Sequence, residues 1–394
     1  MRVLFLNRRL SERGGAERWL LSLLARLQGR AETLLLAGSD DGSLSAAERR
    51  RIGPWKLLRG LDAGRPGRRV PASLAGKLRK LLADFRPHVV HANDLLAPEL
   101  LELVAGSGRG LITVQDHRCF CPGRGKIDAR GRICRVPLGE HCRACLGDEG
   151  YAERMLRLTR GRLEAVADMA AVLVLSKYMA GELVQVGVAA SRIFVVAPWA
   201  DIAPAPPARP HGRRHLHLLA GRLAPHKGVA VALRAARLLG RRQALVIAGD
   251  GPLAGAVAAA ARRPGARVIF AGWLDRRRLA DLLARSASLW LPSLWPEPFG
   301  ISGLEALAAG VPVVASNTGG IGEWLLAGQV GHLVTPGDPV ALARAASSLV
   351  SSPGLATAMG TRGRSQVANS HAAERQLSVI LDIYSKIAGR SPRV

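Results

Sequence analysis

Short apolar runs alternate with amphipathic stretches along the chain. The first apolar run, Val3–Leu6, predicts a buried strand, and the amphipathic stretch 16–27 predicts the helix that follows it. The alternation predicts further strands at 33–37, 89–91, 110–114, 171–175 and 193–196 and further helices at 74–85 and 151–166. Strands that alternate with helices in this way predict a mainly parallel, doubly wound sheet. The segment 38–70 is rich in Gly, Arg and Ser, and we expect a long irregular connection there.

The pattern is interrupted and then starts again. Residues 198–210 are rich in proline, which removes backbone donors and fixes φ, so we expect a stiff linker. A second strand–helix series follows, with strands expected at 215–219, 244–248, 267–270, 289–292 and 312–315. At 394 residues the chain is also longer than one ordinary core requires. We therefore expect two α/β domains, over 1–200 and 201–371.

The chain is strongly basic. Its formal net charge is +26, and only seven of its 56 basic residues are Lys. This charge is consistent with attraction to an anionic membrane face or to a phosphorylated substrate, or with an Arg-rich composition that has no function. Nucleic acid is disfavoured, because the basic residues are scattered, with short runs at 49–51 and 276–278, and no aromatic residues are interleaved with them.

The N-terminal sequence MRVLFLNRR fits a strand and lacks the longer apolar core of a signal peptide. No apolar run approaches the roughly 18 residues of a membrane-spanning helix. We therefore expect a cytoplasmic protein, with peripheral contact to the inner face of the cytoplasmic membrane as one interpretation of its charge. In a reducing cytosol the five Cys residues do not predict a disulfide framework.

The most informative stretch runs from Glu297 to Glu305. It follows the apolar run 289–292 and opens a helix, so that Glu297 would lie in the loop and Glu305 just inside the helix. The backbone N–H groups of Phe299 to Ser302 would face a ligand, and such a helix N-terminus is a natural diphosphate site. A carboxylate nearby can accept hydrogen bonds from a ribose diol. The alternative is a helix N-terminus with two solvated acids.

Two other strand–helix turns carry candidate chemistry. Arg222 and Lys227 lie five residues apart, where both can converge on one anion and stabilise the charge of a departing diphosphate. The alternative for this turn is two surface cations. Gly14 and Gly15 follow the first strand and allow close backbone approach to a ligand, although such a pair is a weak signal alone.

Together these segments resemble the family 4 glycosyltransferases of GT-B fold, over nearly the whole chain. The matching segments are GGAE at 14–17, GRLAPHKG at 221–228, AGDGPL at 248–253, VIFAGWL at 268–274, PEPFGISGLEALAAGVPVVAS at 296–316 and GG at 319–320. The resemblance implies two Rossmann-like domains that face a cleft. It implies retaining transfer of a sugar from a nucleotide-diphosphate donor to a saccharide or lipid-linked acceptor, in bacterial cell-surface polysaccharide or glycolipid synthesis.

The resemblance also implies which residues act. The N-terminal domain would bind the acceptor, the C-terminal domain would bind the donor, and the last helix, 372–388, would return to the N-terminal domain. The implied donor contacts are Arg222 and Lys227 to the diphosphate, Glu305 to the ribose, Glu297 to the donor sugar, backbone groups of Phe299, Gly300 and Ile301 to phosphate or sugar, Trp273 in the segment 271–274 to the base, and close approach at Gly14 and Gly15. Transfer would require no metal, and the chain has no Asp-x-Asp sequence.

One position departs from the family pattern. The family commonly places a His after an N-domain strand, in a run such as Thr-Val-His-Asp. Here the run continues from Val114 through Gln115 and Asp116 to His117. Either His117 points to the same side of an extended segment and takes the catalytic contact, or Gln115 takes it by hydrogen bonding.

The loop 115–146 contains all five Cys residues. Cys121, Cys134, Cys142 and Cys145 follow Cys119, and the Cys-x-x-Cys pair at 142–145 is a half-site for a tetrahedral metal. Because the loop has little apolar content, zinc–thiolate bonds would supply its order. Some transferases of the resembling family carry a similar insert. We expect a structural zinc ion; the alternatives are unpaired thiols in an irregular loop, and an iron–sulfur cluster, which this spacing fits less well.

Two rival functions remain at the level of sequence. One is a GT-B epimerase or phosphorylase, which the Glu-x7-Glu pattern and the Arg/Lys turn disfavour. The other is a degenerate, non-catalytic GT-B binding protein, which Gln115 favours. The intact residues that oppose degeneration are Arg222, Lys227, Glu297 and Glu305.

Overall fold

The computed structural model describes residues 1–64, 70–201 and 215–389. The chain divides into two compact units: unit 1 comprises Met1–Ala197 and Glu374–Val394, and unit 2 comprises Pro198–Ala373. The division falls next to the boundary expected near residue 200. Most of the proline-rich segment 198–210, where we expected a stiff linker, lies outside the described residues.

The described part of unit 1 contains a seven-stranded parallel sheet with the order β3-β2-β1-β4-β5-β6-β7. Its strands are β1 (Arg2–Leu10), β2 (Glu32–Asp40), β3 (Trp55–Leu57), β4 (Val89–Asn93), β5 (Gly110–Val114), β6 (Ala171–Val174) and β7 (Ile193–Val195). Every residue of β4 and β5 is buried, as expected where helices cover both faces of a parallel sheet. The predicted doubly wound parallel fold is confirmed in this unit.

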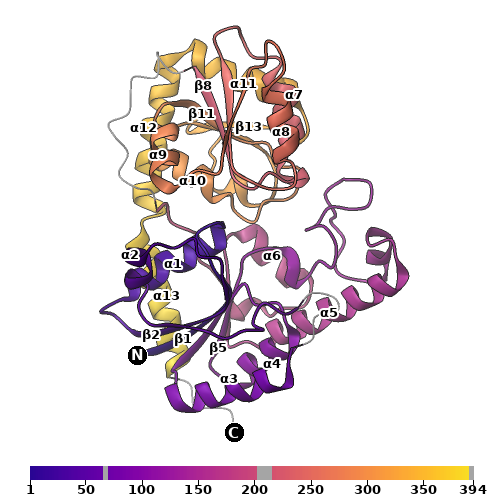
Figure 1. Ribbon diagram of the computed structural model, residues 1–394, viewed down its shortest axis with the longest axis vertical. Coiled ribbons are helices and arrows are strands. Elements are labelled where there is room, and N and C mark those ends of the chain that lie inside the picture. Colours follow the sequence, from indigo (N-terminus) through magenta and orange to yellow (C-terminus); the bar gives the residue numbers. More distant parts are fainter. Residues whose placement is uncertain (65–69, 202–214, 390–394) are drawn as a thin grey trace. The chain divides into compact units, whose positions relative to one another are not determined.

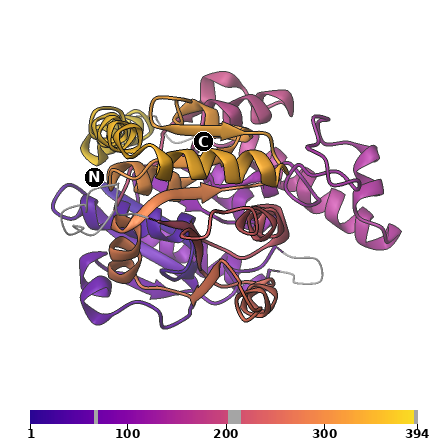
Figure 2. The ribbon, with the colours of Figure 1, turned by 90° about the horizontal axis from the view of Figure 1, so that it is seen from above.

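Helices lie on both sides of this sheet (Figure 1). They are α1 (Gly15–Leu27), α2 (Ala46–Arg51), α3 (Ala72–Phe85), α4 (Pro98–Gly106), α5 (Glu149–Ala167), α6 (Lys177–Gln185) and α13 (Ala373–Ala388), with short 3-10 helices η1 (His117–Cys119), η2 (Glu140–Cys145) and η3 (Ala190–Arg192). The loop after β5 and helix α5 project from the rest of unit 1 in both views (Figures 1 and 2). No helix within the described ranges is long and apolar enough to cross a membrane.

The segment 38–70 is not wholly irregular, contrary to our expectation. It contains α2 and the edge strand β3, which pairs in parallel with β2. A capping box starts α2: Glu48 N donates to Ser45 Oγ at 3.3 Å, and Ser45 N donates to Glu48 Oε2 at 2.8 Å. Both elements are short and mostly exposed, so they leave little apolar periodicity in the sequence.

The last helix belongs to the fold of unit 1. The hydroxyl of Tyr384 on α13 lies 2.6 Å from Nδ1 of His91 on β4, and Nε2 of His91 lies 2.7 Å from Oγ1 of Thr113 on β5. Complete burial lowers the pKa of His91 to about 3, so its ring is neutral. A neutral imidazole has one donor and one acceptor, and both ring nitrogens have partners here. Tyr384 thus fixes α13 to the sheet of unit 1.

Unit 2 repeats the same architecture. Its described sheet has six parallel strands in the order β10-β9-β8-β11-β12-β13. The strands are β8 (Leu216–Ala220), β9 (Ala244–Ala248), β10 (Val268–Gly272), β11 (Ser286–Leu291), β12 (Val313–Ser316) and β13 (Gly331–Val334). The helices, again on both sides of the sheet (Figure 1), are α7 (Val229–Ala236), α8 (Ala254–Ala261), α9 (Arg276–Ala284), α10 (Ile301–Ala308), α11 (Pro339–Ser351) and α12 (Pro353–Ser370), with η5 (Pro225–Lys227) and η6 (Gly319–Glu323).

The strand order of each sheet reverses at one point. The reversal lies between β1 and β4 in unit 1 and between β8 and β11 in unit 2. In open parallel sheets, ligands bind beyond the carboxyl ends of the strands at such a point. In unit 2 these two ends lead into the 221–228 turn and the loop that contains Glu297. In unit 1 they lead to the Gly14 turn and to Asn93, the last residue of β4.

Candidate functional site

The centre of the candidate site in unit 2 is an ion pair between two motifs that are far apart in the sequence. Lys227 Nζ lies 2.8 and 3.1 Å from the two carboxylate oxygens of Glu297. Ser293 Oγ donates a hydrogen bond to the same carboxylate at 2.5 Å. The carboxylate is buried, because the Glu297 side chain is 5% exposed, whereas that of Lys227 is 30% exposed. The reversal of the strand order therefore places a cation and an anion side by side.

The surroundings keep Glu297 ionised. Burial alone would raise the pKa of this carboxyl, but the Lys227 ammonium and the hydrogen bonds from Lys227 and Ser293 outweigh burial and lower the pKa. At neutral pH the pair is therefore a charged one. A carboxylate with both oxygens engaged also holds the flexible Lys227 side chain in one place.

Trp295, which the sequence did not single out, completes the contact between the two loops. Lys227 Nζ lies 4.8 Å from the centroid of the Trp295 ring, and the ring of His226 packs against it at 4.7 Å. Leu294 N and Trp295 N both donate to His226 O, at 2.8 and 3.3 Å. The turn after β8 is thus bonded through its backbone to the loop after β11.

Two glycines allow this close approach. Gly228 has φ 70°, and a Cβ there would lie 1.7 Å from Pro292 O. Gly319 has φ 58°, and a Cβ there would lie 2.2 Å from Glu297 O. Next to it, Gly320 N donates to Glu297 O at 2.8 Å. Because only glycine fits both the space and the backbone conformation, these positions fix the Glu297 loop from two sides.

The N-terminus of α10 lies at the end of the Glu297 loop. Gly300 is the N-cap, with φ 91°, and the first-turn N–H groups of a helix have no carbonyl of that helix to accept them. Phe299 is 3% exposed, so its ring is buried, and its carbonyl accepts a hydrogen bond from Trp324 Nε1 at 2.7 Å. Glu305 lies inside the helix and is 9% exposed. The sequence had placed Glu297 in the loop and Glu305 in the helix, and both placements are correct.

The remaining predicted donor residues lie on neighbouring turns. Arg222 is exposed at the start of the turn that contains Lys227. A Cβ at Gly249 would lie 1.9 Å from Gly221 O, and Gly249 N donates to Gly272 O at 2.7 Å, so the turns after β8, β9 and β10 are in close contact. Trp273 directly follows Gly272 and is 43% exposed. Its ring is therefore accessible at the same edge of the sheet.

In unit 1, three amide side chains form a chain of hydrogen bonds across the carboxyl ends of neighbouring strands. Gln115 Nε2 donates to Asn93 Oδ1 at 2.8 Å, and Asn93 Nδ2 donates to Asn7 Oδ1 at 3.0 Å. These residues come from β1, the end of β4 and the position after β5. Gln115 is partly exposed, whereas Asn7 and Asn93 are buried. Nothing in the sequence pattern had indicated Asn7 or Asn93.

His117 does not share the side of Gln115. It begins η1 rather than continuing an extended segment, and it is 0% exposed. Its Nε2 lies 2.9 Å from the Tyr178 hydroxyl, and its ring packs edge-on against Phe120. A fully buried ring has no surface for an acceptor, so of the two residues considered Gln115 is the one that a ligand can reach.

Gly14 and Gly15 form the start of α1. Gly14 is the N-cap, and Gly15 is the first helical residue. A Cβ at Gly14 would lie 1.9 Å from Glu17 Oε2, whose carboxylate also pairs with Arg9 at 3.1 Å. The absence of a side chain at Gly14 therefore makes room for Glu17 in this structure.

The four expected zinc ligands lie in one region of the cysteine loop. Cys121 Sγ accepts a hydrogen bond from Lys126 N at 3.2 Å, and a Cβ at Gly123 would lie 3.5 Å from Cys145 Cβ. Cys134 N donates to Lys126 O at 2.8 Å. Burial raises the pKa of Cys142, and the neighbouring thiols of Cys121, Cys134 and Cys145 raise it further.

The predicted zinc site is nevertheless not formed in this arrangement. All five cysteines are unbridged. Among the residues that the structure describes, no group of three or more His, Cys, Asp or Glu side chains is placed to hold a metal ion. Protonated thiols do not attract one another, so gathering them on one point requires the metal that removes their protons.

Comparison with known proteins agrees with this architecture. The family model "Glycosyltransferase Family 4" matches residues 13–204, and the model "Glycosyl transferases group 1" matches residues 207–366. A glycogen synthase of Mycobacterium tuberculosis is 35% identical over 185 residues, which are 45% of this chain and 44% of that protein. The lipopolysaccharide core biosynthesis mannosyltransferase LpcC of Rhizobium leguminosarum is 31% identical over 183 residues, which are 45% of this chain and 52% of that protein. The match thus spans about half the length of these curated relatives.

Solved structures resemble the whole fold. The Anabaena protein Alr3699/HepE, solved in complex with UDP-glucose, has a TM-score of 0.73 at 19% identity. The alignment covers 98% of this chain and 100% of that one, and at this identity it shows the fold alone. Two family models that together match both halves, and a fold shared end to end, show that the chain belongs to the family 4 glycosyltransferases of GT-B fold.

Proposed function

We propose that the chain is a retaining glycosyltransferase that moves a sugar from a nucleotide-diphosphate donor to a saccharide or lipid-linked acceptor. The observation that carries this proposal is the Lys227–Glu297 pair, which lies where the strand order of unit 2 reverses. A cation held in one place beside the N-terminus of α10 suits an anionic ligand such as a diphosphate.

The proposed donor site uses groups from three turns. Lys227 and Arg222 bind the diphosphate, and the backbone from Phe299 to Ile301 donates to phosphate or sugar. Glu297 contacts the donor sugar, Glu305 the ribose, and the accessible ring of Trp273 the base. Each of these groups belongs to a turn or helix at the carboxyl edge of the unit 2 sheet.

The chemistry needs stabilisation of negative charge. The bond between C1 of the sugar and the diphosphate oxygen breaks, the acceptor oxygen bonds to C1, and the proton of the acceptor hydroxyl passes to the departing diphosphate. Charge grows on the diphosphate as it leaves. The Lys227 ammonium and the N–H dipoles of α10 are already in place to stabilise this charge, which is the arrangement that accelerates such a step. In this proposal, transfer requires no metal ion.

In unit 1, we propose that Gln115 takes the acceptor contact. It is partly exposed and is oriented by Asn93, so its amide oxygen can accept a hydrogen bond from a sugar hydroxyl. Its neutral side chain can orient an acceptor hydroxyl but cannot take its proton.

The donor proposal is tested with nucleotide sugars. A panel of UDP-, GDP- and ADP-sugars would be screened by thermal shift, with UDP-glucose first because a protein of the same fold was solved with it. A donor at 100 times its Kd stabilises the protein by about 2.7 kcal/mol. Slow release of sugar from the best donor to water would then show that the bond is cleaved. A panel in which no nucleotide sugar raises the Tm would contradict the proposal.

We propose further that the acceptor belongs to cell-surface polysaccharide or glycolipid synthesis, at the inner face of the cytoplasmic membrane. A net charge of +26 supports contact with anionic lipids. Co-sedimentation with phosphatidylglycerol vesicles is expected, and phosphatidylcholine vesicles are the control. Equal binding to both vesicles would contradict membrane contact driven by charge.

The cysteine loop supports a separate proposal of one structural zinc ion per chain, held by Cys121, Cys134, Cys142 and Cys145. The spacing of the cysteines supports it, and so does the hydrogen bond that Cys121 Sγ accepts from Lys126 N at 3.2 Å. Burial raises the pKa of Cys121 and outweighs the backbone hydrogen bonds that lower it, so a bound metal ion would have to displace the proton of this thiol. Four thiolates leave no position for substrate. Elemental analysis of protein purified without added metal is the direct test. Absence of zinc and iron, with five titratable thiols in the folded protein, would refute it.

A further inference from the structure

A buried ion pair attaches the cysteine loop to helix α6. Lys126 Nζ lies 2.9 Å from Glu182 Oε2, and the two side chains are only 4% and 13% exposed. The same ammonium donates to Val136 O at 3.0 Å. The backbone of Lys126 donates to Cys121 Sγ at 3.2 Å and accepts from Cys134 N at 2.8 Å. Lys126 is therefore bonded to two cysteines through its backbone and to α6 through its side chain.

Tyr178 continues this connection from α6 toward β5. It lies one helical turn before Glu182 and is hydrogen-bonded to the Glu182 carboxylate. Its hydroxyl is also 2.9 Å from His117 Nε2. A hydroxyl has one proton and a carboxylate can only accept, so Tyr178 donates to Glu182 and accepts from Nε2–H of His117. The direction of both hydrogen bonds is thus fixed by the charge on Glu182.

His117 is the last step before Gln115. Its carbonyl accepts from Phe120 N at 3.0 Å and from Cys121 N at 2.7 Å, so the segment from His117 to Cys121 is a closed turn. Gln115 lies two residues before this turn and hydrogen-bonds to Asn93. A set of contacts therefore runs from the cysteines to His117, and the backbone through Asp116 joins His117 to the partly exposed Gln115.

We propose that Lys126, Glu182, Tyr178 and His117 are positioning residues that hold Gln115 in place for the acceptor. The order of the cysteine loop then determines how well the acceptor is used. This inference rests on the proposed function, since it gives the acceptor contact of that function to Gln115. It assigns His117 a role that acts through its neighbours, without contact to substrate.

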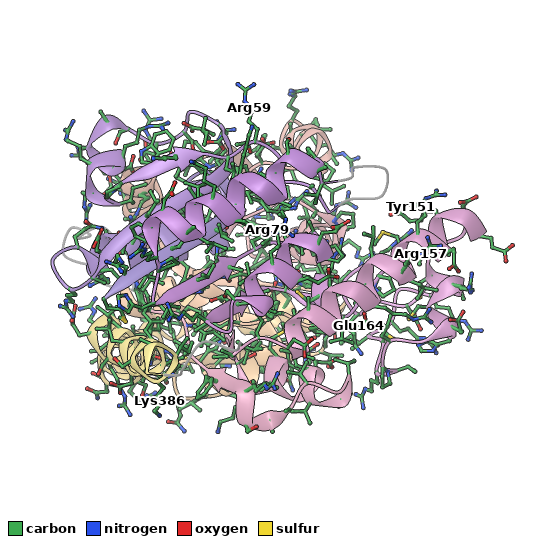
Figure 3. The ribbon with its side chains drawn as sticks, turned by 90° about the horizontal axis from the view of Figure 1, so that it is seen from below. Arg59, Arg79, Tyr151, Arg157, Glu164 and Lys386 are labelled. Atoms are coloured by element: carbon green, nitrogen blue, oxygen red, sulfur yellow. The ribbon has the colours of Figure 1, made fainter. Side chains whose placement is uncertain are left out.

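Two matched pairs of variants test the inference. Tyr178→Phe removes the hydroxyl that joins Glu182 to His117, and Tyr151→Phe is its control at the surface of α5 (Figure 3). Glu182→Gln removes the charge that faces Lys126, and Glu164→Gln, also exposed on α5 (Figure 3), is its control. Should Glu182→Gln fail to fold, Tyr178→Phe alone still decides, because it keeps the ion pair.

The first readout does not depend on activity. Hydrogen exchange at the amides of Phe120 and Cys121 should be at least about threefold faster in Tyr178→Phe than in Tyr151→Phe, because the turn at His117 loses its anchor. The second readout is kinetic, with UDP-glucose as donor and a panel of alkyl glycosides as acceptors. The acceptor KM should rise by about 3- to 10-fold, because the variant lacks one hydrogen bond that holds Gln115 in place. The Kd for UDP should stay unchanged.

The outcomes separate the two proposals. Unchanged exchange at Phe120 and Cys121 in Tyr178→Phe would overturn the inference, as would an equal loss of UDP affinity and acceptor use. A lower Tm with an unchanged acceptor KM would show a merely structural role and would overturn it too. If the wild-type protein neither binds nor cleaves any nucleotide sugar, the proposed function fails, and the exchange experiment still decides whether Tyr178 orders the turn.

Discussion

Removing the Lys227 ammonium tests the candidate donor site most directly. Lys227→Met keeps the length of the side chain and leaves the buried Glu297 carboxylate without its cation. Removing one partner of a buried ion pair costs about 3–5 kcal/mol. Because the Lys227 side chain is 30% exposed, water weakens this pair, and we expect about 2–3 kcal/mol. For a domain of this size, that lowers the Tm by about 4–12 °C.

The loss of stability in Lys227→Met should depend on pH in a defined direction. In the wild type the folded-state pKa of Glu297 is lowered, so its stabilisation is present above the unfolded pKa of about 4.3 and is lost as pH falls through the folded value. In Lys227→Met, burial raises the folded pKa instead, so the carboxylate destabilises the fold above about pH 4.3. The difference in the free energy of unfolding between the wild type and Lys227→Met should therefore be largest at neutral pH and should shrink as the pH falls.

Thermal unfolding at pH 4.5 and pH 7.5 measures this difference. Lys80→Met, an exposed position on α3, is the matched control and should show no deficit at either pH. Affinity for UDP at pH 7.5 should fall by about 10- to 150-fold, the value of a lost charge-assisted contact. An equal deficit at both pH values, or unchanged UDP affinity, would refute the assignment of Lys227 and Glu297.

Three further outcomes are expected. Gly228→Ala should cost about 3 kcal/mol or more in urea unfolding, because its Cβ would lie 1.7 Å from Pro292 O at a φ of 70°. Gly255→Ala, in α8 with open space around it, should be neutral or stabilising by up to about 1 kcal/mol, and similar values for the two would contradict the argument. Tyr384→Phe should cost about 1–3 kcal/mol, because buried His91 Nδ1 loses its partner, and a loss below about 0.5 kcal/mol would argue against this role of α13. Transfer should survive brief treatment with EDTA in the cold, whereas recovery that requires added magnesium would show a metal in the reaction.

The fold was predictable because its central strands are buried on both faces. Runs such as Val3–Leu6 and 110–114 are buried and largely apolar, and helical stretches separate such runs along the chain, so the parallel sheets are visible in the sequence. The position of Glu305 inside α10 followed from the same alternation. The short elements α2 and β3 were missed because mostly exposed segments have no such pattern.

The burial of His117 has a local cause. The sequence left open whether His117 or Gln115 takes the acceptor contact, and His117 would point to the side of Gln115 only if the segment stayed extended. Instead, the Asp116 carboxylate accepts a hydrogen bond from Arg118 N at 2.9 Å, which starts the 3-10 turn and directs His117 into the core. An Asx turn of this kind depends on one side-chain rotamer, and hydrophobic periodicity contains no information about it.

The geometry of the candidate donor site could not be predicted because it depends on contacts between distant loops. The sequence predicted Lys227 and Glu297 as separate candidates, and their pairing spans 70 residues. Gly228 and Gly319 make that pairing possible: each has a positive φ, and each brings backbone to the Glu297 loop at a distance that no other residue allows. Electrostatic catalysis requires charges that are fixed before the reaction, so that no reorganisation accompanies the step. In this protein the two glycines supply that rigidity. Gly228→Ala should therefore lower the affinity for UDP more than a Gly→Ala substitution at any unit 2 turn where an added Cβ meets no neighbouring atom.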